Sequence, residues 1–197
     1  MRPVRPAEHV TLLEQRRDEL RAVVDRFIGT GARIVWEVGS GHGHFLTAYA
    51  KAHPSDLCVG VDIMSDRVAR AQRKRDRAKL ANLHFVRADA ADFLAVLPAE
   101  ARFTSVFVLF PDPWPKRRHH KNRVMTEEFL SAVAARSGTG ARLNFRTDYP
   151  PYFQAAATLL RAHADWAEVD PADWPFEEAT VFQKRADAHF SLVARRR

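Results

Sequence analysis

The fold is decided by the stretch Ile34-Val35-Trp36-Glu37-Val38-Gly39-Ser40-Gly41-His42-Gly43. Its first five residues are largely aliphatic, β-branched or aromatic, which is typical of a short buried strand. Three glycines at alternate positions follow. They predict a tight turn near a ligand, because glycine adopts positive φ angles and lets the backbone approach other groups closely. We therefore expect a strand, a glycine-rich turn and then a helix.

Beyond this stretch, strand patterns alternate with helical patterns. Further strands are expected at residues 57–62, 83–87, 105–110, 141–145 and about 188–194. Helices are expected at 65–79 after a cap at Ser65, from about Asp89, after a cap at Thr126, and between Asp148 and Ala164. Strands that alternate with helices predict a single α/β domain, with a mostly parallel sheet covered by helices on both faces.

The N-terminal segment has a helical pattern of its own. Apolar residues recur at spacings near three and four from Leu12 to Phe27. We expect residues 1–30 to form a helical segment that packs on a domain made of residues 31–197. The chain shows no internal repeat and no low-complexity linker.

The chain is strongly basic. Its 197 residues, the length of one domain, carry a formal charge of +7 and have an isoelectric point near 10.1. Lysine and arginine bind phosphates with release of condensed counterions, so this charge favours a polyanionic partner such as RNA. For the cations of the helix at 65–79, a solvated outer face is the better interpretation, and phosphate contact is the alternative.

Cys58 is the only cysteine, which excludes an internal disulfide and a cysteine-based metal cluster. Its apolar neighbours Leu57 and Val59 predict a small buried residue rather than a nucleophile. The histidines show no metal-ligand spacing, and no window approaches the roughly 18 apolar residues of a membrane span. We expect a cytoplasmic protein that binds neither a metal nor a membrane.

The spacing of the glycine turn separates two kinds of nucleotide site. Dinucleotide-binding turns place glycines as G-x-G-x-x-G around a pyrophosphate. Here Gly39, Gly41 and Gly43 give G-x-G-x-G, and Glu37 precedes them. A carboxylate at this point repels a pyrophosphate but can hold the ammonium group of a methionine moiety. The pattern therefore disfavours a nicotinamide-dependent oxidoreductase.

Acidic residues also follow the next two expected strands. Asp62 ends the strand at 57–62, where folds of this kind hold the two ribose hydroxyls. Asp89 follows the strand at 83–87, where its carboxylate can meet an adenine amino group, although capping the next helix is an equally good interpretation. Three acids at three successive strand ends are harder to explain by capping alone.

The most specific stretch is Val108 to Arg123, with the sequence VLFPDPWPKRRHHKNR. An apolar strand ends there in a stiff loop, because prolines fix φ and remove hydrogen-bond donors. The loop presents Asp112, Trp114 and then a run of cations. A carboxylate can accept hydrogen bonds from the N1–H and N2–H₂ edge of guanine, and cations can hold phosphates. For Lys121 and Arg123, a solvated loop and RNA contact are equally good interpretations.

This loop resembles the motif of the bacterial tRNA (guanine-N7-)-methyltransferase family, which is close to F-P-D-P-W-P-K-K-R-H-x-K-R-R. The resemblance extends from about Glu37 to about Lys184, with the glycine turn, Asp62, Asp89 and Thr147-Asp148 in matching order. It implies a Rossmann-like class I methyltransferase domain with a mostly parallel seven-stranded sheet. It also implies methyl transfer from S-adenosyl-L-methionine to N7 of a guanosine in the variable region of tRNA.

The resemblance also implies roles for particular residues. The cofactor-binding residues, including the glycines of the turn, would be Glu37, Gly39, Gly41, Gly43, Asp62, Asp89 and Asp112. Asp112 would also be the catalytic residue. The substrate-binding residues would be Lys116, Asp148, Thr180 and Gln183. We expect a monomer or homodimer that binds tRNA without an obligate protein partner.

Three positions depart from the family pattern. Asn122 stands where the family usually has a second arginine, which removes one phosphate contact. Gln183 replaces the glutamate of a T-x-F-E segment and so lacks its negative charge, and a glycine expected near His189 is absent. These departures concern substrate choice and catalytic efficiency more than the class of reaction.

The chemistry expected at Asp112 is electrostatic. N7 of guanine carries an in-plane lone pair and no proton at neutral pH, so its methylation needs no strong general base. A carboxylate near the ring that becomes cationic stabilises the transition state more than the ground state, and Asp148 would assist. Two alternatives stay open: a methyltransferase of the same fold with a drifted substrate, either a small molecule or a protein, and a tRNA-binding relative without turnover.

Overall fold

The computed structural model describes residues 6–178 and 188–197. They form a seven-stranded sheet in the order β3-β2-β1-β4-β5-β7-β6. The strands are β1 (Arg33–Val38), β2 (Leu57–Asp62), β3 (Leu83–Arg87), β4 (Arg102–Leu109), β5 (Ser137–Thr147), β6 (Trp166–Val169) and β7 (Phe190–Arg196). The first five strands pair in parallel, and β7 runs antiparallel to both β5 and β6. The prediction of one α/β domain with a mostly parallel seven-stranded sheet is confirmed.

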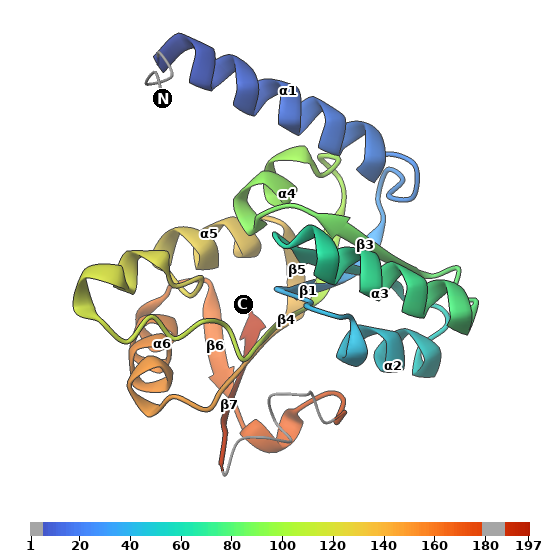
Figure 1. Ribbon diagram of the computed structural model, residues 1–197. Coiled ribbons are helices and arrows are strands. Elements are labelled where there is room, and N and C mark those ends of the chain that lie inside the picture. Colours follow the sequence, from blue (N-terminus) through green and yellow to red (C-terminus); the bar gives the residue numbers. More distant parts are fainter. Residues whose placement is uncertain (1–5, 179–187) are drawn as a thin grey trace.

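Helices connect the strands and cover the sheet (Figure 1). They are α1 (Pro6–Val24), α2 (His44–Ala52), α3 (Ser65–Ala78), α4 (Ala90–Val96), α5 (Glu127–Ala135) and α6 (Pro150–Ala162), with two 3-10 helices, η1 (Arg117–Asn122) and η2 (Pro171–Asp173). Figure 1 shows α1 lying across α4, and Arg17 Nε donates there to Asp92 Oδ1 at 2.7 Å. No helix in the described part of the chain is long and apolar enough to cross a membrane.

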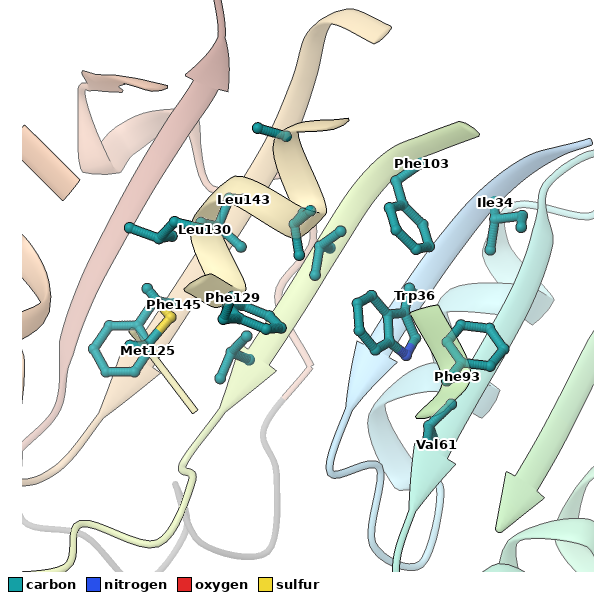
Figure 2. Close-up of a cluster of buried hydrophobic side chains, with 14 of the residues drawn as sticks. Ile34, Trp36, Val61, Phe93, Phe103, Met125, Phe129, Leu130, Leu143 and Phe145 are labelled. Atoms are coloured by element: carbon teal, nitrogen blue, oxygen red, sulfur yellow. The ribbon is translucent and has the colours of Figure 1, made fainter. Parts of the chain in front are cut away.

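The alternation of side chains along β1 divides the core into two layers. Ile34 and Trp36 face the layer under α4, α5 and α6, whereas Val35 faces the layer under α2 and α3. Trp36 is fully buried, and its ring centroid lies 5.2 Å from that of Phe93 and 5.0 Å from that of Phe103. Figure 2 shows these aromatic side chains gathered against the sheet. Because both faces are covered, the inner strands are almost continuously apolar.

The parallel register brings the ends of five strands to one edge. Asp62 at the end of β2 pairs with Arg87 at the end of β3, and Leu109 at the end of β4 pairs with Arg146 in β5. The glycine turn and the segments that follow β2, β3, β4 and β5 therefore all lie at this carboxyl edge. Open α/β sheets bind their ligands at this edge.

Three strands depart from the sequence-based expectation. β4 and β5 begin earlier than predicted, at Arg102 and Ser137, because these first residues are polar and lie outside the apolar centre of each strand. Strand β6 (Trp166–Val169) was not predicted at all. It has four residues at the edge of the sheet, and only Trp166 is buried, so it shows little periodicity.

The predicted helix caps are confirmed at two positions and wrong at a third. Thr126 caps α5 and Asp89 caps α4 through their side chains. Ser65 is the first residue of α3 rather than its cap. Met64 holds the cap position, and its N–H donates to the Asp62 carboxylate instead.

Cys58 is fully buried in β2. Burial raises the pKa of its thiol to about 12, and the charges of Asp56 and Glu37 contribute to the rise. The thiol therefore stays protonated at neutral pH. The prediction of a buried, unreactive residue is confirmed.

Candidate active site

The glycine turn between β1 and α2 has the backbone conformation that its sequence predicts. Gly39, Gly41 and Gly43 have φ angles of 71°, 52° and 69°, values that residues with a β-carbon rarely adopt. The N–H groups of Gly39 and Ser40 donate to the Val61 carbonyl at 2.8 and 3.0 Å. These bonds attach the turn to the end of β2 at the carboxyl edge.

Gly43 also lies against a side chain. A β-carbon at this position would be 2.5 Å from Phe85 Cζ, whereas a β-carbon at Gly39 would meet nothing within 4 Å. Overpacking costs about 1–3 kcal/mol, and the left-handed conformation costs about 1–2 kcal/mol for a residue with a side chain. We therefore expect Gly43→Ala to lower the free energy of unfolding by about 2–5 kcal/mol.

Urea unfolding of Gly43→Ala and Gly39→Ala measures this difference. Gly39→Ala is the matched control, because it has nearly the same φ angle without the collision. We expect it to lose only about 1–2 kcal/mol. Equal losses in the two variants would contradict the role given to the Phe85 contact.

Asp62 is held between the glycine turn and the start of α3. It is 5% exposed, and its Oδ2 accepts from the Gly41 N–H at 2.9 Å while its Oδ1 accepts from the Met64 N–H at 2.8 Å. Arg67 Nη1 lies 4.0 Å from Oδ2. Each carboxylate oxygen has a second lone pair, so the fixed carboxylate can still accept hydrogen bonds from two ligand hydroxyls.

Glu37 lies at the end of β1 and is 4% exposed. Burial raises the pKa of its carboxyl well above the usual range. A hydrogen bond from the Leu46 N–H opposes the rise, the charge of Asp62 adds to it, and the charge of Lys74 opposes it. Glu37 Oε2 and the nearby Ser40 Oγ are buried without a hydrogen-bond partner among the described residues. Because an unpaired buried acceptor is costly, a ligand N–H group would be stabilised here.

A cavity of about 730 Å³ opens between α1, α3 and the end of β3. Its wall includes the apolar side chains of Ile63, Val86 and Ala88, together with the carboxylate of Asp89. Asp89 Oδ1 accepts from the Asp92 N–H at 2.8 Å, so this residue caps α4 and lines the cavity at the same time. The size and the mixture of apolar and polar groups fit a small heterocyclic ligand.

The loop after β4 has a strained backbone. Phe110 and Trp114, which flank the Pro-Asp-Pro sequence, have φ angles of 48° and 44°. Such conformations are concentrated at functional sites. The Phe110 N–H donates to the Arg146 carbonyl at 2.7 Å, which attaches the loop to the end of β5. Asp112 in this loop and Asp148 after β5 are both exposed at the carboxyl edge.

The basic residues after this loop divide into two kinds. Lys116 and Lys121 are exposed, as contact with phosphates requires. Arg123 is only 8% exposed: its Nε donates to the Pro113 carbonyl at 2.9 Å, and its Cζ lies 4.6 Å from the centroid of the Tyr152 ring. The interpretation of Arg123 as a solvated loop residue is wrong, and the interpretation as an RNA contact stays a prediction. Its guanidinium holds the loop of Asp112 in place.

Arg146 is a residue of this edge that the sequence analysis missed. It is 4% exposed at the end of β5 and forms a bidentate ion pair with Glu177, at 2.6 and 2.9 Å. Its Nε donates to Ser191 Oγ at 2.8 Å, and its Cζ lies 3.9 Å from the centroid of the Trp174 ring. Arg146 thereby attaches the chain around Glu177 to the sheet. The signal for it was a cation directly after the expected strand 141–145.

The structure brings the sequence-predicted residues together at one edge of the sheet, with two exceptions. Thr180 and Gln183 lie outside the described residues. The residues at the ends of the strands are Glu37, Gly39, Gly41, Gly43, Asp62, Asp89, Asp112 and Asp148, and Lys116 lies further along the loop after β4, just before η1.

The chain is similar to proteins from several bacteria. It is 33% identical over 179 residues to a tRNA (guanine-N(7)-)-methyltransferase of Magnetococcus marinus, a match that covers 87% of this chain and 71% of that protein. It is also 33% identical over 142 residues to the protein of that name from Alkalilimnicola ehrlichii, over 72% of this chain and 60% of the relative. Its fold matches that of SMU.1697c, a "putative methyltransferase" from Streptococcus mutans in complex with SAH, with a TM-score of 0.58, 12% identity and 100% of each chain covered.

The strand order and the glycine turn at the edge of the sheet define a class I methyltransferase by fold. Residues 31–189 match a family model described as "Putative methyltransferase". The chain belongs to the tRNA (guanine-N(7)-)-methyltransferase family. It spans less than two thirds of the length of several curated relatives, such as 60% of the Alkalilimnicola protein and 56% of the Streptomyces coelicolor protein.

Proposed function

We propose that this protein transfers the methyl group of S-adenosyl-L-methionine to N7 of a guanosine in the variable region of tRNA. The observation that carries the proposal is a row of acidic residues at the carboxyl ends of four strands that lie on both sides of β1: Asp62, Asp89, Asp112 and Asp148. The first two suit a cofactor with hydroxyl and amino groups. The other two suit a base that becomes positively charged. The names of the relatives support the same reaction.

The residues around the glycine turn fit the parts of this cofactor. The unpartnered Oε2 of Glu37 would accept a hydrogen bond from the methionine ammonium group. Asp62 would accept from the ribose hydroxyls, and Asp89 would accept from the adenine amino group in the cavity. Among the described residues, no side chain stands within 4 Å of the β-carbon positions of Gly39 and Gly41, so the backbone there is open to a ligand. When bound, the cofactor supplies an electrophilic methyl group on a sulfonium.

The contribution of the chain to the reaction is alignment and electrostatic support. Asp112 would orient the guanine through its N1–H and N2–H₂ edge and stabilise the positive charge that the ring gains. Asp148 would add a second negative charge from the neighbouring strand end. Arg123 and Arg146 would act as positioning residues, because they fix the loop of Asp112 and the end of β5 through the contacts described above.

The proposal includes the partner and the location of the protein. Exposed Lys116 would hold a phosphate beside the target, and Thr180 and Gln183 would contact the nucleoside. The formal charge of +7 supports a polyanionic partner. The domain of residues 31–197, with residues 1–30 packed on it, would act in the cytoplasm as a monomer or homodimer, without an obligate protein partner.

Methyl-labelled S-adenosylmethionine and bulk tRNA provide the direct test. We expect label in tRNA, at N7 of a guanosine when the modified nucleotide is mapped. Preferential labelling of small nucleosides or of protein would show that tRNA is not the substrate and that the enzyme methylates one of these molecules instead. Binding of tRNA without any heat of association with the cofactor would contradict the proposed reaction altogether.

A further inference from the structure

A basic groove lies beside the glycine turn, on a different face of α3 from the cavity that contains Asp89. It has a volume of about 380 Å³. Its lining is made of two histidines next to the turn and four cations of α3: His42, His44, Arg70, Arg73, Lys74 and Arg77. Among the described residues, no acidic side chain lines it. Figure 1 shows α2 and α3 next to each other at this part of the molecule.

The four cations of α3 form a stripe of like charge. Their spacing of three and four residues puts them on one face of the helix, where each like-charged pair destabilises the helix by about 0.2–0.5 kcal/mol. Other arginines of α3 lie near acids: Arg67 is 4.0 Å from Asp62, and Arg75 is 2.7 Å from Asp76. Within residues 6–178 and 188–197, no acidic partner is found for Arg70, Arg73 or Arg77. The three arginines of the stripe therefore lack the nearby acids that Arg67 and Arg75 have.

Lys74 connects this groove to the cofactor side of the molecule. Its Nζ is buried and has no hydrogen-bond partner in the described part of the chain. Burial lowers the pKa of the ammonium group, the charge of Arg77 lowers it further, and the charge of Glu37 opposes this. An ammonium group has three donors to satisfy. The buried charge adds to the positive potential of the groove.

We propose that this groove binds phosphate groups of the RNA backbone, at a site separate from the one that holds the target guanosine. A nucleic-acid strand with several phosphates fits the groove better than a single anion does, because the stripe from Arg70 to Arg77 extends about 10 Å along the helix. Arg70, Arg73 and Arg77 are exposed, as the sequence-based interpretation of a solvated face predicts, and together with His42 and His44 they line a groove that is open to a polyanion. That the bound polyanion is RNA rests on the proposed function. That the groove binds phosphates rests on its own charges and does not depend on the proposed function.

The test is a double variant, Arg70→Gln with Arg73→Gln, compared with a control of equal charge change. The control is Arg26→Gln with Arg33→Gln, two exposed arginines, of which Arg33 begins β1 at the opposite edge of the sheet. Each lost phosphate contact reduces the slope of log Kd against log salt by about 0.9 and weakens binding roughly tenfold near 0.1 M salt. We expect a slope reduced by about 1–2 for the groove variant and little change for the control.

Three further measurements separate this inference from the proposed function. Calorimetry with S-adenosylmethionine is expected to give the same affinity for the groove variant and the wild type. A short stem-loop that carries the target guanosine is expected to be methylated equally by both, because its few phosphates do not extend to the groove. Methyl transfer by the wild-type protein tests the proposed function alone.

The possible outcomes are distinct. If the groove variant binds tRNA like the control, or if the wild-type protein binds no tRNA, the groove inference is overturned. If tRNA binding depends on Arg70 and Arg73 but no methyl group is transferred, the groove inference stands and the proposed function fails.

Discussion

Asp112→Asn is expected to lower the rate constant of methyl transfer to tRNA by about 100- to 1000-fold, the usual effect of removing one preorganised electrostatic group from an active site. The substitution keeps the size of the side chain and removes its negative charge. Guanine is neutral before the transfer and cationic after it, so the charge of Asp112 matters more in the transition state than in the ground state. Because Asp112 is exposed in its loop, we expect the variant to fold normally.

Single-turnover kinetics on tRNA measure this effect, and calorimetry with S-adenosylmethionine measures cofactor binding separately. We expect cofactor affinity to change far less than the rate constant. Asp25→Asn, at an exposed position just after α1, is the control for the loss of one surface charge. A variant at position 112 with a near-normal rate constant, or with an effect confined to KM, would remove Asp112 from the chemistry.

The sequence predicts the backbone of the candidate site well, namely the glycine turn and the strand ends, because few conformations fit the local sequence pattern there. The glycines at 39, 41 and 43 require positive φ angles, and the structure has them. The acids at 62, 89 and 112 follow apolar strands, and parallel pairing places such ends at one edge. Local sequence and sheet geometry together are enough to assemble this part of the site.

The side-chain contacts that fix the loops of the candidate site join residues that are distant in sequence, so the sequence alone does not predict them. Arg123 stands in a run of exposed cations, and only its packing against Tyr152 shows that it is buried. The ion pair of Arg146 joins residues 31 positions apart. The groove cations belong to a helix whose composition favours a solvated face, and Arg70, Arg73 and Arg77 are indeed exposed, but only the structure shows that His42 and His44 lie beside them.

Glu37→Gln is expected to have opposite effects on cofactor binding and on stability. If Glu37 accepts a hydrogen bond from the cofactor's ammonium group, the substitution removes a charged hydrogen bond worth about 1.5–3 kcal/mol. We therefore expect cofactor affinity to fall by roughly 10- to 100-fold. The protein without cofactor is expected to become more stable at neutral pH, because folding no longer buries a carboxylate oxygen that lacks a partner.

The stability effect has a predictable dependence on pH. Burial raises the pKa of the Glu37 carboxyl in the folded state, so this state keeps its proton to a higher pH than the unfolded chain does. Between the unfolded and the folded value, the folded protein binds more protons, and its stability falls as the pH rises through this window. The amide that replaces the carboxyl in the variant cannot ionise, so the variant lacks this fall. Its advantage over the wild type is expected to be small near pH 4 and about 1–2 kcal/mol at neutral pH.

Thermal unfolding of both proteins, with and without S-adenosylmethionine, measures the two effects in one experiment. A gain of about 1–2 kcal/mol corresponds to about 2–8 °C for a chain of this size. Added cofactor is expected to stabilise the wild type more than the variant, since stabilisation by a ligand follows its affinity. Glu100→Gln, at an exposed position before β4, is the control. If Glu37→Gln binds the cofactor as tightly as the wild type, the buried carboxylate supports only the glycine turn and does not contact the methionine ammonium group.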